Sequence, residues 1–195
     1  MLSVVIPTRD CERALVRTLA VLVGAAVAGA VREVIVADGG SQDETTKVAE
    51  IAGCNVLVSA DPPAVRLRAA AAAARASWLL FLRPGAMPDP AWAEEAIRVV
   101  EDFERRGALD TAAVFRLEPA GASPSLGGQA MALLREAVRR RPSPDQGLLI
   151  GRRFYESLGG HPDGAAPEEA LLDRIGRRRL IRLRSGITGG EPAGQ

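Results

Sequence analysis

Histidine, lysine and cysteine are scarce in this sequence. His161 is its one histidine, Lys47 its one lysine, and Cys11 and Cys54 its two cysteines. One histidine is too few for a zinc site made of several imidazoles, and it leaves a single candidate for a Ser-His catalytic pair. Neither cysteine has a second thiol at metal-ligand spacing, and the sequence shows no secretory signal. We therefore expect reduced thiols in a cytoplasmic protein.

Aromatic residues and net charge are also low. Phe, Trp and Tyr make up 4% of the chain, and the formal net charge is +1. Because single-stranded nucleic acid is usually bound by a basic surface with aromatic stacking platforms, a nucleic-acid partner is not expected. The longest apolar run, residues 19–31, is shorter than the ~20 residues that cross a bilayer. We expect no transmembrane segment.

Arginine supplies almost all of the positive charge, and it is clustered. Runs of arginine occur at residues 139–141, 152–153 and 177–179. Such runs are usually solvated helix faces. The alternative is a basic surface for a phosphorylated, lipid-linked acceptor or an anionic membrane, which would place the protein peripherally at the membrane.

What the sequence does contain is a regular alternation of apolar runs and helical patterns. Strands are expected at residues 2–6, 33–37, 55–59, 78–82 and 112–117, with helices between them that begin near residues 10, 41, 64 and 90. This alternation predicts βαβ units and an α/β fold. The strands are apolar throughout, which predicts a mainly parallel sheet covered by helices on both faces.

The pattern weakens after residue 117. Residues 118–128 are typical of a loop, residues 129–141, 152–158 and those from 167 onward of helices, and residues 180–184 of a last strand. We expect one domain over residues 1–195, with a nucleotide-binding half at 1–117 and an acceptor-side half at 118–195.

Ligands of such sheets bind beyond the carboxyl ends of the strands, so the loops at residues 7–10, 38–43 and 83–87 should converge. Asp38 ends the second strand and is followed by Gly39 and Gly40. A strand-end carboxylate can accept hydrogen bonds from a base or a ribose, and glycines let a ligand approach the backbone. The alternative is an ordinary capped turn between a strand and a helix.

Three blocks of the sequence are distinctive: SVVIPT at residues 3–8, EVIVADGGSQD at 33–43 and WLLFL at 78–82. Weaker blocks are DQG at 145–147, GGHP at 159–162 and PEE at 167–169. Together they resemble the family-2 glycosyltransferases of the GT-A fold, in particular the short bacterial forms associated with radical-SAM or selenium-domain proteins. The resemblance implies a Rossmann-like three-layer sandwich with a mainly parallel, mixed sheet, and transfer of a sugar from a nucleotide-diphosphate-sugar to an unknown acceptor.

The resemblance also implies roles for residues. The positions that match donor binding are Pro7, Thr8, Asp10, Asp38, Gly39, Arg66 and Gly85. Among them, Asp38 matches the carboxylate that contacts the nucleobase, and Arg66 lies on the helix that flanks the diphosphate. Glu169 matches the general base, and residues 145–147 match the acceptor side. Without the resemblance, Glu168 and Glu169 would be read as acids that the helix dipole favours in a first turn.

One departure from the family concerns the metal. The family holds a divalent ion, Mn or Mg, with an acidic motif after the fourth strand, where this chain has Arg83-Pro84-Gly85-Ala86 and no carboxylate before Asp89. A metal cofactor is therefore not assigned. Two hypotheses follow: Arg83 acts as the cation that stabilises the leaving diphosphate, or the domain is an inactive module that binds a nucleotide-sugar or a partner. A solvated loop arginine is the simplest interpretation of Arg83.

Overall fold

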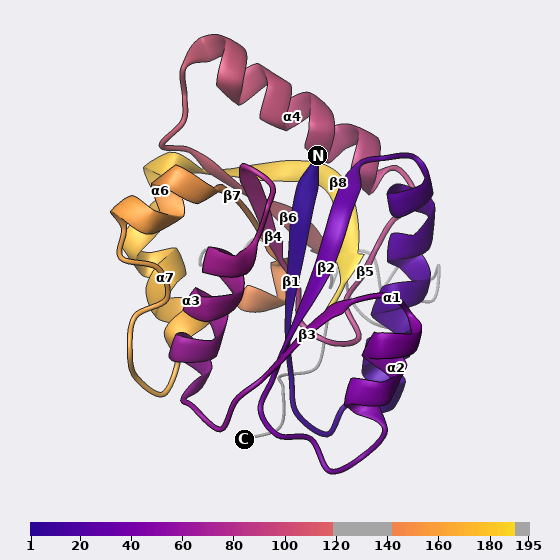
Figure 1. Cartoon of the computed structure of the whole chain (residues 1–195). Coiled ribbons are helices and arrows are strands. Elements are labelled where there is room, and N and C mark those ends of the chain that lie inside the picture. The colour runs from indigo at the N-terminus through magenta and orange to yellow at the C-terminus, as the bar shows by residue number, and fades with distance from the viewer. Residues whose placement is uncertain (119–141, 190–195) are drawn as a thin grey trace, which may run out of the picture.

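The computed structural model describes residues 1–118 and 142–189. In this part of the chain, strands form one mixed sheet in the order β3-β2-β1-β4-β7-β6-β8-β5 (Figure 1). The strands are β1 (Leu2–Thr8), β2 (Val31–Asp38), β3 (Asn55–Val58), β4 (Trp78–Phe81), β5 (Met87–Pro88), β6 (Ala112–Glu118), β7 (Leu148–Gly151) and β8 (Leu180–Thr188). Strands β3, β2, β1 and β4 are parallel, and β7 runs antiparallel to both of its neighbours.

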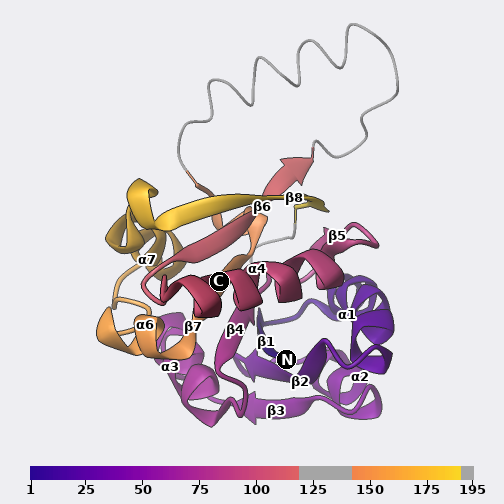
Figure 2. The ribbon, with the colours of Figure 1, turned by 90° about the horizontal axis from the view of Figure 1, so that it is seen from above.

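Helices cover both faces of the sheet. They are α1 (Glu12–Val27), α2 (Thr45–Ile51), α3 (Pro63–Ala73), α4 (Trp92–Arg106), α6 (Arg152–Ser157) and α7 (Pro167–Ile175), with short 3-10 turns η1 (Pro144–Gln146) and η2 (Arg177–Arg179). Figures 1 and 2 show α1 and α2 on one side of the sheet and α3, α6 and α7 on the other. The mixed, mainly parallel α/β sandwich that the sequence predicts is confirmed.

The two layers of core explain why consecutive residues in the middle of β1 are apolar. Val4 and Ile6 of β1 pack into the cluster that includes α1 and α4, whereas Val5 packs into the cluster that includes α3, α6 and α7. Since successive side chains of a strand point to opposite faces, a strand covered on both faces must be apolar at every position.

Several boundaries differ from the predictions. Helix α1 begins at Glu12 with Cys11 as its N-cap, and Asp10 lies outside it with φ of 48°. Strand β7 was not predicted, because its apolar stretch between Gly147 and Gly151 is short. Strand β8 runs four residues past the predicted end at 184, to Thr188. The predicted helix at 129–141 and most of the predicted loop at 118–128 lie outside the described residues.

Neither cysteine shows the features of a reactive group. Within residues 1–118 and 142–189, Cys11 and Cys54 are free thiols, and burial raises the pKa of each to about 11. Both are therefore protonated at neutral pH. In the same residues, no helix is long and apolar enough to cross a bilayer.

Candidate functional site

The carboxyl ends of β1 and β2 bring two of the predicted site residues into contact. Thr8 and Asp38 are the last residues of these strands, are paired in register, and are both fully buried. The Thr8 hydroxyl donates a hydrogen bond to Asp38 Oδ1 at 2.8 Å. The convergence of these two loops follows from the parallel pairing and agrees with the expectation from the sequence.

Asp38 orders the turn that follows it. Oδ1 accepts hydrogen bonds from the hydroxyls of Thr8 and Ser41, and Oδ2 accepts from the backbone N–H groups of Gly40 and Ser41, both at 2.8 Å. An ionised carboxylate has about four acceptor sites, and this one uses four. The capped turn that was the alternative interpretation is therefore present, and a contact between Asp38 and a nucleobase stays a prediction.

Asp10 links the same two loops. Its N–H donates to Ser41 Oγ at 2.9 Å, and its Oδ1 accepts from the N–H of Gln42 at 2.6 Å. At the start of α1 the capping acceptor is Asp43, whose Oδ2 accepts from the N–H of Glu12 at 3.1 Å. The sequence did not single out Asp43 for this role, because the bond crosses between loops more than thirty residues apart.

Arg66 on α3 lies beneath this edge of the sheet. Its side chain is buried, and Nη1 donates to the carbonyl oxygens of Thr8 and Ala37 at 3.2 and 3.3 Å. Within the described residues, Arg66 Nε is the one buried side-chain nitrogen or oxygen with no hydrogen-bond partner. Burial lowers the pKa of Arg66, although the charge of Asp38 opposes this. A buried N–H without an acceptor requires an explanation, and a ligand acceptor is one.

Gly39 makes room for Arg66. A Cβ atom at position 39 would lie 2.9 Å from the guanidinium carbon of Arg66, closer than real Cβ contacts. In this structure the group that approaches the Gly39 backbone is an arginine of the same chain, and the approach of a ligand stays a prediction.

Arg83, just past the end of β4, is surrounded by carboxylates. Nε and Nη2 both donate to Glu168 Oε2, at 3.0 and 2.7 Å, and Nη1 donates to Asp145 Oδ1 at 2.8 Å. Nη2 also lies 3.4 Å from Glu169 Oε1. The Arg83 side chain is 12% exposed, so the interpretation as a solvated loop arginine is wrong.

Carboxylates outnumber the single positive charge at Arg83. Burial by itself would lower the pKa of Arg83, but the hydrogen bond to Glu168 and the charges of Glu168, Asp145 and Glu169 together raise it. The guanidinium is therefore permanently charged, and one positive charge faces three carboxylates. Glu169 is the least engaged of the three, with its side chain 49% exposed against 24% for Glu168.

The residues after β4 do not fit a divalent metal. Gly85 has no side chain, and its N–H donates to the carbonyl of Ala14. Asp89 is used elsewhere, since its carboxylate accepts from the N–H groups of Ala91 and Gly186 at the junction of α4 and β8. Across the part of the chain that the structure describes, no three His, Cys, Asp or Glu side chains are arranged to hold a metal ion.

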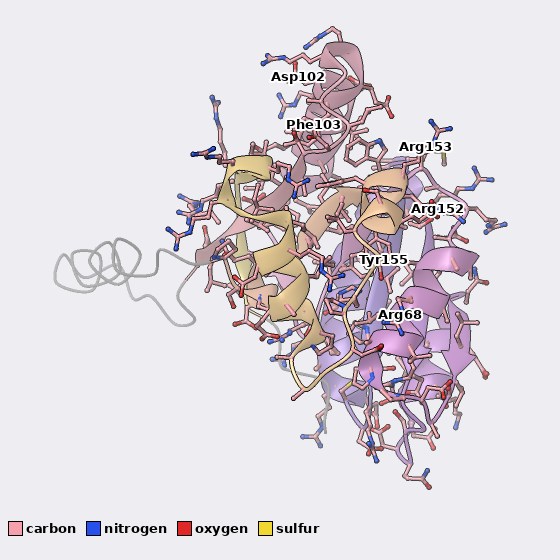
Figure 3. The ribbon with its side chains drawn as sticks, turned by 90° about the vertical axis from the view of Figure 1, so that its left-hand side faces the viewer. Arg68, Asp102, Phe103, Arg152, Arg153 and Tyr155 are labelled. Carbon is pink, nitrogen blue, oxygen red and sulfur yellow. The ribbon has the colours of Figure 1, made fainter. Side chains whose placement is uncertain are left out.

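The one histidine is a buried structural residue. His161 Nδ1 and the Tyr155 hydroxyl are 2.7 Å apart, and the His161 ring meets Phe81 edge-on. Figure 3 labels Tyr155 and Arg68 in this region, where Arg68 donates to the carbonyl of His161. Burial lowers the pKa of His161 to about 3, so the imidazole is neutral at physiological pH.

A cavity of about 540 Å³ lies at the opposite end of β4, beside Trp78, Arg152 and Arg153. Both arginines are labelled in Figure 3. Arg152 is already bound to the carbonyls of Ala72 and Ala74, which end α3. This cavity is therefore separate from the strand ends that carry Thr8 and Asp38.

Comparison with known families gives one match. The model of the family described as "Glycosyl transferase family 2" matches residues 3–160. No curated protein matches the sequence.

Solved structures share the fold. Glucosyl-3-phosphoglycerate synthase from Mycobacterium tuberculosis, in complex with Mn²⁺, UDP and glucosyl-3-phosphoglycerate, is similar with a TM-score of 0.70 and 20% identity, over 100% of this chain and 72% of that one. TarS residues 1–349 from S. aureus is similar with a TM-score of 0.69 and 16% identity, over 96% of this chain and 60% of that one. A TarS structure with UDP-GlcNAc has a TM-score of 0.68 and 18% identity, over 100% of this chain and 59% of that one.

Proposed function

Because this chain belongs to glycosyl transferase family 2, we propose that it transfers a sugar from a nucleotide-diphosphate-sugar to an acceptor hydroxyl. The solved structures of the same fold support a nucleotide donor, since their names include UDP and UDP-GlcNAc. The acceptor is not carried over from these neighbours, because this chain spans only 72% and 60% of the two proteins.

The observation that carries the proposal is the convergence of Thr8, Asp38 and the Arg66 guanidinium at the strand ends. This buried cation lies against the carbonyls of Thr8 and Ala37. A nucleotide offers the acceptor oxygens that such a group requires. In this proposal Thr8, Asp38 and Arg66 form the floor of the donor site. The donor-site residues in the loops around it are Pro7, Asp10, Gly39 and Gly85.

Glu169 is the proposed general base. Its carboxylate takes the proton of the acceptor hydroxyl while that oxygen bonds to the anomeric carbon and the bond from this carbon to the diphosphate oxygen breaks. The electron pair of the broken bond leaves with the nucleoside diphosphate. Asp145 and Glu168 are less suited to this role, because both make close ion pairs with Arg83.

No step is assigned to a metal, since the residues after β4 do not fit one. Arg83 is the nearby cation that the sequence put forward for the leaving diphosphate, and this role stays a prediction. A non-catalytic module that binds a nucleotide-sugar or a partner is the second candidate. The specific observation in its favour is that all three guanidinium nitrogens of Arg83 already donate to carboxylates.

Replacement of the base separates the two candidates. Glu169→Gln should abolish release of nucleoside diphosphate from nucleotide-sugars and leave nucleotide binding intact, because only proton removal is lost. Glu101→Gln, an exposed acid on α4, is the matched control and should behave like the wild type. Full activity of Glu169→Gln would refute the base assignment. Binding without turnover in the wild type would instead favour the non-catalytic module.

The lipid-linked acceptor is the finer part of the proposal. Arg177 and Arg178 are exposed on η2, whereas Arg179 is partly used to bond the carbonyl of Ile175 and to stack on Phe154. We expect sedimentation with liposomes to increase with their content of anionic lipid. Sedimentation that does not depend on anionic lipid would remove the membrane from the proposal.

A further inference from the structure

Arg83 joins three segments that are far apart in the sequence. It follows β4, and its partners Asp145 and Glu168 come from η1 and from the first turn of α7, 62 and 85 residues later. The contact with Glu168 involves two guanidinium nitrogens, Nε and Nη2, on one carboxylate. Such paired contacts fix the orientation of both groups as well as attracting them.

This contact also determines where the proposed base lies. Glu168 and Glu169 are neighbours in the first turn of α7, which begins at Pro167. Adjacent helical residues point about 100° apart, so holding Glu168 against Arg83 sets the direction of Glu169. The outcome is visible in the exposed fractions: Glu168 is largely covered and Glu169 is half open to solvent.

The Arg83 guanidinium has few N–H groups free to bind the diphosphate of a nucleotide-sugar. Every one of its nitrogens donates to a carboxylate of the acceptor-side half, and its side chain is 12% exposed. A diphosphate that bound Arg83 would have to displace Glu168 or Asp145, and it would then meet their unpaired negative charges.

We propose that Arg83 is a positioning residue, which holds Glu168 and Asp145 so that Glu169 points at the acceptor, and that it does not bind the donor diphosphate. The inference rests on the proposed function, and it differs from the role that the sequence suggested for Arg83. The two roles predict different effects on affinity: loss of a positioning residue lowers turnover and leaves nucleotide binding unchanged, whereas loss of a diphosphate contact weakens nucleotide binding as well.

The experiment compares Arg83→Met, Glu168→Gln and the control Arg106→Met. Arg106 makes an exposed ion pair with Asp102, which Arg105 also contacts, at the far end of α4. For each folded variant, two quantities are measured. They are the Kd of UDP, GDP, CDP, ADP and dTDP by calorimetry, and the rate of nucleoside diphosphate release from the corresponding nucleotide-sugars with water as acceptor.

We expect Arg83→Met to lower the release rate by about tenfold or more, the cost of a misplaced catalytic group, with Kd changed by less than about threefold. Glu168→Gln should lower the rate in the same way, and Arg106→Met should change neither quantity. Arg83→Lys should recover part of the rate, because it keeps the charge but not the paired geometry. Glu168→Gln keeps the test possible if Arg83→Met fails to fold.

Three results would overturn the inference. The first is nucleotide binding weakened about tenfold in Arg83→Met, whatever the release rate per bound donor. The second is an unchanged rate in both Arg83→Met and Glu168→Gln. The third is a wild type that binds no nucleotide at all, which would refute the proposed function itself and this inference with it.

Discussion

At the scale of single residues, the site depends on close approaches that the sequence does not display. The sequence identifies Gly39 and Arg66 separately, as a glycine after a strand and an arginine on a helix. The structure shows that the position of Arg66 requires a glycine at position 39, since a Cβ there would collide with the Arg66 guanidinium. Pattern-based reasoning finds the residues, but a contact between positions 39 and 66 follows only from the packing of α3 against β1 and β2.

Gly39→Ala tests that contact. The φ of Gly39 lies outside the left-handed region, so alanine fits the backbone and the strain falls on Arg66. We expect nucleoside diphosphates to bind about tenfold more weakly, since a displaced cation loses a charged hydrogen bond worth about 1.5–3 kcal/mol. Calorimetry measures this. Gly24→Ala, where nothing lies within 4 Å of the new Cβ, is the control and should bind like the wild type.

His161 makes stability depend on pH. Its folded-state pKa of about 3 lies below its usual value of 6.5, so the unfolded chain binds a proton that the folded protein does not. The free energy of unfolding that depends on the neutral imidazole is fully present above about pH 6.5. It is lost as the pH falls toward 3, by up to about 1.4 kcal/mol per pH unit. His161→Phe removes this contribution.

Denaturant unfolding at pH 7.5 and pH 5 measures the effect. The wild type should lose about 2 kcal/mol more than His161→Phe between these two conditions. Equal losses in the two proteins would show that the buried imidazole does not titrate in this way.

At the scale of elements, the loops after β1 and β2 stabilise each other. Asp43 accepts hydrogen bonds from the N–H groups of both Glu12 and Thr45, so one side chain serves the first turns of α1 and α2. Those hydrogen bonds also outweigh the effect of burial and lower the pKa of Asp43. The loops of the proposed donor site are thus held by the helix starts beside them.

Asp43→Ala should therefore destabilise the protein more than an ordinary surface substitution. Loss of one N-cap costs about 0.5–2 kcal/mol, and here two helix starts are affected. Urea unfolding gives the free energy difference. Glu50→Ala, an exposed acid on α2, should change it by less than about 0.5 kcal/mol. A similar small change in Asp43→Ala would contradict the shared cap.

Elements with strong periodicity could be predicted, and short ones could not. Strand β4 is wholly apolar, β1 and β2 contain apolar runs at residues 4–6 and 34–37, and α1 has apolar residues at helical spacing. Strand β7 carries only three apolar residues before its final glycine. It is a strand because β4 and β6 pair with it on both sides, and such pairing is not visible in a local sequence window.

At the scale of the whole molecule, the meeting of the loops after β1 and β2 could be predicted and the environment of Arg83 could not. Parallel strands bring Thr8 and Asp38 to one edge by topology alone. The partners of Arg83 reach it through the antiparallel insertion of β7, which carries η1 to the end of β4. That connection follows the segment between 119 and 141, where the sequence pattern is weakest.

The same arrangement predicts that nucleotide binding does not require a metal. Gly85 offers no ligand, and the Asp89 carboxylate is bonded to backbone N–H groups. We expect the thermal stabilisation by a nucleoside diphosphate to be the same in EDTA and in manganese, about 2.7 kcal/mol at a hundredfold excess over Kd. Stabilisation that appears only with manganese would contradict the description of this site as unsuited to a metal.

The central claim is that a nucleotide binds where β1 and β2 end, against Arg66. Calorimetric titration of UDP, GDP, CDP, ADP and dTDP into the wild type and into Arg66→Met tests it most directly. The account predicts that at least one of them binds the wild type and that the variant binds it about tenfold or more weakly, because the charged hydrogen bond is lost. Equal affinity for the two proteins, or no binding to the wild type, would contradict it.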